Sequence, residues 1–235
     1  MMMLHCGGRA VEFPELEAVP LPEETNTYIP VPFGDLVKNT REAADDLLKD
    51  HTFNSAQYAL AGKDQKMFAI LQYNSDNEEM GYAIGIRSSY DKSMTNGFCI
   101  GAKVFVCDNM AFTGDITYMR KHTKNVWNDL EEKLVTTIYS SRNKFKNILH
   151  DRKVMGERIV GTDQGYEFMG KLVGNNILKP RQMSVAMKCW KTPPYEEFGP
   201  RNMWSLYNAC TEALKSTPPN KILEQHINLH NYATA

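Results

Sequence analysis

A turn near the middle of the sequence gathers side chains that could bind a phosphate group. Arg87 presents a planar guanidinium, which suits phosphate or carboxylate. Polar and aromatic neighbours could hold sugar-phosphate and stack on bases without base preference. An internal role is equally coherent, with Arg87 paired to Asp108 and short polar side chains closing turns. The sequence leaves both interpretations open for this group, which consists of Arg87, Ser89, Tyr90, Lys92 and Asn109.

A second candidate is the basic face of a long helix. Between residues 117 and 156 the chain has no proline and no internal glycine, and its apolar residues recur at spacings of three, four and seven. This pattern predicts one helix of about 40 residues. The faces away from the apolar stripe either contact phosphates or are simply solvated. Their basic residues are Arg142, Lys144, Lys146, Arg152 and Lys153.

The charge distribution is compatible with a polyanionic partner. The whole chain has a net charge of −1, but residues 1–115 carry 9 Lys and Arg against 17 Asp and Glu, while residues 116–235 carry 18 against 11. Such an asymmetry allows a basic surface on a nearly neutral protein. Attraction between the two parts of the chain, or between protomers, explains the asymmetry equally well.

Catalytic and metal motifs are weaker. The sequence has no GxSxG, Walker-type loop, HExxH or paired CxxC motif, so no cofactor is expected. Asp91, Asp108 and Asp115 follow strand ends, where a cation or general base could be built, but Asp also favours turns for its own hydrogen bonds. His226 and His230 are spaced i, i+4 on a helix, and the interpretation that we favour for them is structural.

The elements that must position these residues predict an α+β fold. Four short apolar or alternating stretches, at 57–62, 66–73, 79–87 and 98–106, are separated by turn-forming residues and predict an antiparallel β-meander. The long helix packs on this meander, and a helical C-terminal half follows. Shorter helices are predicted at 36–50, 163–175, 180–190, 202–216 and 221–231.

The domain organisation expected is simple. Residues 1–34 are proline-rich and predict an extended N-terminal arm, followed by a single α+β domain at 35–235 that is sheet-rich over 35–115 and helical over 116–235. No apolar stretch is long enough for a membrane helix, and the first residues lack the features of a signal peptide. Five scattered cysteines favour reduced thiols. We therefore expect a cytoplasmic protein with no membrane partner.

Three segments resemble those of a family of phage- and plasmid-encoded proteins of unknown function. Arg87-Ser-Ser-Tyr-Asp-Lys-Ser is similar to its R-N-S-x-D-x-S segment, with Ser88 in place of the usual Asn. Gly101-Ala-Lys-Val-Phe-Val-Cys-Asp-Asn is similar to its G-x-x-V-x-V-C-x-N segment, and Asn208-Ala-Cys-Thr211 matches its N-A-x-T motif. The resemblance covers residues 40 to 230 and implies a mobile-element protein in the cytoplasm of a bacterial host, without implying an activity.

Three functions are therefore considered. The first is non-enzymatic binding of single-stranded nucleic acid by an oligomer, with an accessory role in annealing or recombination. The reason is an analogy of architecture, because single-strand annealing proteins also place a meander before a long helix. The second is binding to a host protein, which would inhibit or redirect a defence or replication factor. A hydrolase built on the three aspartates comes last. Because the long helix offers more apolar surface than a small sheet covers, a homo-oligomer is expected.

Overall fold

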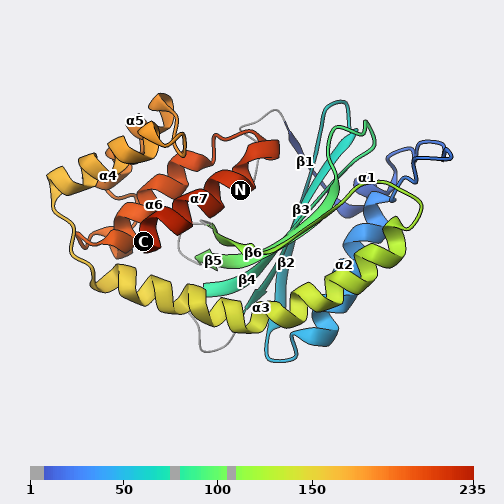
Figure 1. The fold of residues 1–235 in the computed structure, drawn as a ribbon, viewed down its shortest axis with the longest axis horizontal. Helices are drawn as coiled ribbons and strands as arrows, with labels where there is room; N and C mark the ends of the chain where they lie inside the picture. The colour runs from blue at the N-terminus through green and yellow to red at the C-terminus, as the bar shows by residue number, and fades with distance from the viewer. Residues whose placement is uncertain (1–7, 75–79, 105–109) are drawn as a thin grey trace.

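The sheet has six antiparallel strands, and neighbours in the sheet are also neighbours in the sequence (Figure 1). This is a computed structural model, which describes residues 8–74, 80–104 and 110–235, without the side chains of residues 80, 102–117, 142–144, 219, 220 and 223. The strands are β1 (Arg9–Val11), β2 (Thr52–Ala61), β3 (Lys66–Asn74), β4 (Met80–Ser89), β5 (Asn96–Val104) and β6 (Met110–Arg120). The predicted α+β class, a meander followed by a helical C-terminal half, is confirmed.

The helices occupy both ends of the chain. In the N-terminal part lie α1 (Phe13–Glu17) and α2 (Phe33–Leu47). After the sheet come α3 (Val126–Glu157), α4 (Thr162–Gly174), α5 (Pro180–Lys191), the 3₁₀ helix η2 (Glu196–Phe198), α6 (Met203–Leu214) and α7 (Pro219–Thr234). In Figure 1, α3 extends from the sheet to the group formed by α4 to α7. It therefore joins the two parts of the molecule, and α7 of the helical group also contacts β6 of the sheet.

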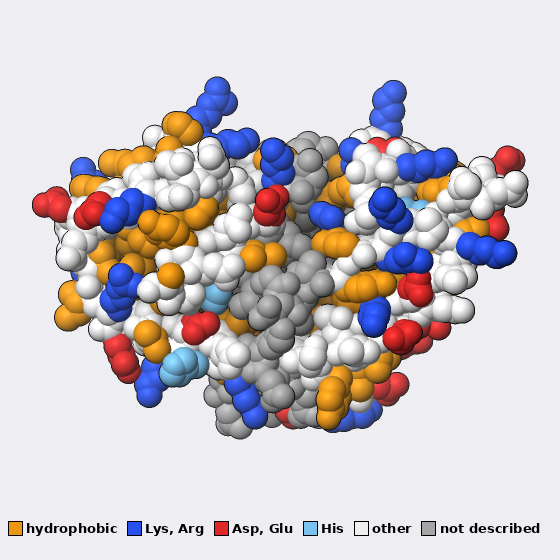
Figure 2. Space-filling model, viewed as in Figure 1, with side chains coloured by type: hydrophobic (Ala, Val, Ile, Leu, Met, Phe, Trp, Pro, Cys, Tyr) orange, Lys and Arg blue, Asp and Glu red, His pale blue; other side chains and the backbone are white. Residues whose placement is uncertain are grey.

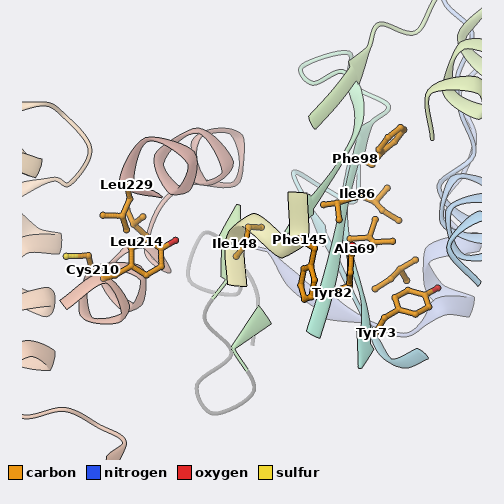
Figure 3. Close-up of a cluster of buried hydrophobic side chains, with 14 of the residues drawn as sticks. Ala69, Tyr73, Tyr82, Ile86, Phe98, Phe145, Ile148, Cys210, Leu214 and Leu229 are labelled. Atoms are coloured by element: carbon orange, nitrogen blue, oxygen red, sulfur yellow. The ribbon is translucent and has the colours of Figure 1, made fainter. Parts of the chain in front are cut away.

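One face of the sheet packs against α2 and α3, and the side chains alternate accordingly. Tyr82, Ile84 and Ile86 of β4 belong to the hydrophobic core, whereas Gly85 and Arg87 point to the other face. Phe145 of α3 stacks on Tyr82, with ring centroids 4.1 Å apart (Figure 3). Further along the same helix, Ile148 belongs to the cluster that includes Leu214 and Leu229. The inner face of α3 is thus covered within one chain.

The long helix is shorter than the sequence pattern predicts. It has 32 residues and begins at Val126, because residues 110–120 form β6 and pair with β5. Apolar residues at even spacings in this strand, Phe112, Ile116 and Tyr118, fit a strand period, although residues 117–120 also belong to the stretch without proline and glycine that favoured a helix. The open edge of β5 offers hydrogen-bond partners to the backbone N–H and C=O groups of residues 110–120, which favours a strand there.

The N-terminal arm is not merely extended chain. Residues 9–11 form the edge strand β1, and residues 13–17 form α1 with Pro14 in its first turn, where a missing N–H costs little. Val11, Leu16, Val31 and Phe33 are all buried in the core. Their apolar side chains tie this segment to the sheet despite its prolines. The division of the chain into an arm and a single domain stays a prediction.

Candidate nucleic-acid interface

The side chains of Ser89 and Tyr90, in the turn between β4 and β5, make internal contacts that hold the fold together. Ser89 is buried, and its Oγ donates to the Met94 carbonyl at 3.1 Å and accepts from the Met94 N–H at 2.9 Å. The buried ring of Tyr90 stacks on Phe33 with centroids 3.7 Å apart, and its hydroxyl accepts a hydrogen bond from the Phe33 N–H at 3.1 Å. Burial raises the pKa of Tyr90 to about 12. In this conformation neither side chain is accessible to a base or a phosphate.

The tip of the same turn is exposed but already has internal contacts. Lys92 adopts a left-handed φ of 62°, and its Nζ lies 4.4 Å from the centroid of the Tyr28 ring. Asp91 accepts hydrogen bonds from the backbone and hydroxyl of Ser93, at 2.9 and 2.6 Å, and lies 3.4 Å from Lys66 Nζ. Burial favours the neutral acid, but these hydrogen bonds and the ammonium lower the Asp91 pKa overall. This geometry is that of a turn residue.

Arg87 lies on the other side of the sheet from α3. It points to the face opposite Tyr82, and Tyr82 is the residue that α3 covers. Its Nε is buried and has no hydrogen-bond partner in the described part of the chain, and burial lowers its pKa. Arg87 and the outer basic residues of α3 therefore do not share one surface in this arrangement.

The outer side of α3 has mixed charge. Lys146 and Lys153 are exposed, but Glu131 and Glu132 are exposed on the same helix. Arg152 is half-buried, with its guanidinium carbon 5.9 Å from the centroid of the Trp204 ring. Five residues named in the sequence analysis, or their side chains, lie outside the described part of the structure. They are Arg142, Lys144, Asp108, Asn109 and Asp115.

A more uniform basic surface lies on α5, which the sequence analysis overlooked. Four exposed cations occur between residues 179 and 191, and this stretch contains no acidic residue. Within the described residues none of the four forms an ion pair, whereas Lys171 and Lys215 on the adjoining helices α4 and α6 pair with carboxylates at 2.7 and 2.6 Å. The four cations are Lys179, Arg181, Lys188 and Lys191. A count of charges along each predicted helix would have found them.

The packing of α5 fixes the direction of this surface. Trp190 is fully buried and lies against Gly165 of α4, so closely that a Cβ at that position would lie 2.5 Å from its Nε1. Arg201 donates hydrogen bonds to the carbonyls of Trp190 and Lys191, and its guanidinium carbon lies 4.5 Å from the centroid of the Trp190 ring. At the other end, Gln182 accepts from the Lys179 N–H at 2.9 Å. Both ends of α5 are thus held, and its basic side faces solvent.

A groove in the helical part offers a different kind of surface. It has a volume of about 490 Å³ and lies between α4, α7 and the end of α3. Beside it Ile159 is 84 % exposed, which is unusual for a large aliphatic side chain. On the face of the molecule that Figure 2 shows, basic and acidic side chains are interspersed with apolar ones. The lining residues include Phe168, Met203, Tyr232, Arg158 and Lys171.

The histidines examined for metal binding are buried. His226 and His230 lie on α7 at 5 % and 2 % exposure, and the Nε2 of His230 is 3.2 Å from an Asp151 carboxylate oxygen. Burial lowers the pKa of His230, although Asp151 acts in the opposite direction. Among the side chains that the structure describes, no three His, Cys, Asp or Glu residues are grouped to hold a metal ion.

Two buried histidines, His122 and His230, should make stability depend on pH. Burial also lowers the pKa of His122, although the Ile29 and Met94 carbonyls act against this. Unfolded histidine titrates near pH 6.5, so below about that pH the unfolded chain takes up protons that the folded chain does not. The free energy of unfolding should therefore fall between about pH 7 and pH 5.5. Urea titrations across this range should show a smaller fall for His122→Asn and for His230→Asn. If the unfolding free energies of the wild type and both variants fall by the same amount over this pH range, these two histidines are not the source of the pH dependence.

Comparisons with known proteins assign neither a family nor a function to this chain. No protein-family model matches the sequence, and no curated protein and no solved structure matches it. The resemblance to phage and plasmid proteins stays a prediction. Within the described part of the chain, no helix combines the length and apolar character needed to cross a membrane.

Proposed function

We propose that the protein binds single-stranded nucleic acid without catalysis, through the outer face of α5. The observation that carries this proposal is a set of four cations, Lys179, Arg181, Lys188 and Lys191, that form no ion pair with the described residues and share a stretch without carboxylates. Phosphate neutralisation by such side chains supplies most of the affinity of sequence-independent binding. On the resemblance described above, we propose this activity for a mobile-element protein in a bacterial cytoplasm.

A nucleic acid fits this surface better than a membrane does. Membrane-surface helices insert an apolar face next to a basic one. In α5 the apolar side is already used, because Ala186 and Trp190 are fully buried against neighbouring helices. What remains outside is Arg181, Ser184 and Lys188, with Val185 as an isolated apolar residue at 43 % exposure. Such a surface can contact a phosphate backbone but cannot insert into lipid.

A partly exposed aromatic residue beside α5 favours a single strand. Tyr195 is 38 % exposed and, together with Cys189 of α5, lines a small cavity. Base stacking on such rings is worth about 1–3 kcal/mol per base and needs unpaired bases. The adjoining Glu196 and Glu197 are exposed and repel phosphate, so they limit the surface at this end.

The test compares two double variants of equal charge. Arg181→Gln with Lys188→Gln removes two cations from α5, and Lys121→Gln with Lys124→Gln removes two exposed cations near the start of α3. Fluorescence anisotropy on a labelled single strand at several salt concentrations gives the dependence of the binding constant on salt. Each lost phosphate contact lowers the slope by about 0.7, so the α5 variant should lose about 1.4. The control variant should keep the wild-type slope.

The result that would overturn the proposal is equally direct. No binding by the wild-type protein at about 50 mM salt, where phosphate attraction is strong, excludes it. Equal slopes for the two double variants exclude α5 as the site. Tighter binding to a duplex than to the single strand contradicts the stacking role assigned to Tyr195.

The second candidate function is binding to a host protein, as an inhibitor or redirector of a defence or replication factor. The observation that favours it is the groove beside the exposed Ile159, since exposed apolar side chains next to a concave surface are typical of protein contacts. A complex formed there should survive rising salt, whereas a nucleic-acid complex should not. Capture from host lysate with and without nuclease separates the two.

A further inference from the structure

The outer side of α3 carries exposed apolar residues that its own chain does not cover. Tyr139 is 71 % exposed and Val135, one turn before it, is 48 % exposed. Residues 135, 139 and 146 lie along one side of the helix, because spacings of four and seven residues return to the same face. This side is about a quarter-turn around the helix from Ile138 and Phe145, which are buried in the core. A large aromatic ring thus stands near the middle of a 32-residue helix, facing solvent.

The charges on this side are ordered along the helix axis. Glu131 and Glu132 lie towards the N-terminus of α3, and Lys146 and Lys153 lie towards its C-terminus, all exposed. Glu132 and Lys146 are each seven residues from Tyr139, on either side of it. A second copy of the helix laid antiparallel, with the two Tyr139 side chains at the centre, places Glu132 of one copy opposite Lys146 of the other, twice. The surface is therefore complementary to itself.

We propose that two copies of the protein associate through α3, antiparallel and about a twofold axis at Tyr139. In a twofold interface each contact occurs twice, so one aromatic contact and two ion pairs come from three residues per chain. Lys146 has no ion pair within the described residues, and Glu132 has only an exposed contact of 3.5 Å with the adjacent Lys133. Both side chains can turn to a partner at little cost.

The apolar stripe of the long helix does not require a second copy of the protein, because Leu130, Ile138 and Ile148 are buried within one chain. What remains is a narrow strip on a helix roughly 48 Å long, at 1.5 Å per residue. A strip of this kind falls below the ~800 Å² per partner of a standard interface, so we expect a dissociation constant on the order of micromolar.

A charge exchange tests the geometry. Glu132→Lys alone sets like charges opposite each other twice in the dimer, as does Lys146→Glu alone. Each should weaken association about tenfold, since two exposed ion pairs are lost and two repulsions are gained. The double variant restores opposite charges across the axis and should return to the wild-type dissociation constant. Tyr139→Asp, which sets two carboxylates at the centre, should leave a monomer.

The measurement is sedimentation velocity on the full chain after nuclease treatment, from about 1 to about 100 µM, which brackets a weak interface. All four variants are at exposed positions, so circular dichroism melts should match the wild type and show that the fold is intact. A monomeric wild type across the whole range overturns the proposal. So does a double variant that associates no better than the single ones. Neither outcome depends on nucleic-acid binding by α5.

Discussion

Replacing Tyr90 by Ala should lower the free energy of unfolding by about 3–5 kcal/mol, the usual cost of deleting a buried aromatic ring. The ring is 5 % exposed and stacks on Phe33, and it joins the β4–β5 turn to the segment that begins α2. Its loss leaves a cavity between two parts of the chain and removes the acceptor of the Phe33 N–H. A loss of this size is a large part of the 5–15 kcal/mol that a typical domain has.

The control is Tyr90→Phe, which keeps the ring and removes only the hydroxyl. It should cost about 1 kcal/mol, because one buried N–H loses its partner. Urea titrations monitored by tryptophan fluorescence measure both variants. If Tyr90→Ala unfolds within about 1 kcal/mol of the wild type, the ring is not the packing element described here, and a role in binding becomes the better explanation of this residue.

Two glycines of α4 should respond to the same substitution with opposite signs. Gly165→Ala adds a methyl group 2.5 Å from Trp190 Nε1 and 2.9 Å from Cε2, so α4 and α5 must separate or the indole must shift. Overpacking of this kind costs about 1–3 kcal/mol. Gly170→Ala, five residues along the same helix, meets nothing within 4 Å and should raise stability by about 0.5–1 kcal/mol through helix propensity.

Thermal and urea unfolding of the two alanine variants gives the comparison directly. The two variants are well matched, because both replace a glycine by alanine in the same helix and reduce the conformational entropy of the unfolded chain equally. Only the environment of the new methyl group differs. Stabilisation by both substitutions would show that the contact between Gly165 and Trp190 is looser than the structure has it.

The sequence predicts the fold better than it predicts the binding surface. Alternating apolar residues between turn-forming residues identify four of the strands, because a two-residue period depends only on local sequence. In β6 the same period was present, but its last four residues, 117–120, belong to the long stretch without proline and glycine that favoured a helix. The strand β1 is three residues long and depends on pairing with β2, which no local pattern can show.

The candidate site shows the same limit at the level of single side chains. Ser89 and Tyr90 are polar residues in a turn, and such residues are usually available to a ligand. They are buried because residues 28 and 33, about sixty positions earlier in the chain, pack on the turn. Arg87 and Lys146 are both cations, yet they lie on opposite sides of the sheet. By contrast, the uniform charge of α5 was readable in the sequence without any tertiary information.

The order of strands in the sheet has a consequence for how the chain folds. Every pairing from β2 to β6 joins strands that follow each other in sequence, so closing each hairpin requires only a short loop. Local pairings of this kind form quickly, and the N-terminal part of a chain leaves the ribosome first. We infer that the meander assembles while α3 to α7 are still being synthesised. The part of its apolar face that α3 covers is then exposed until α3 emerges, which makes that interval the period of greatest risk of aggregation.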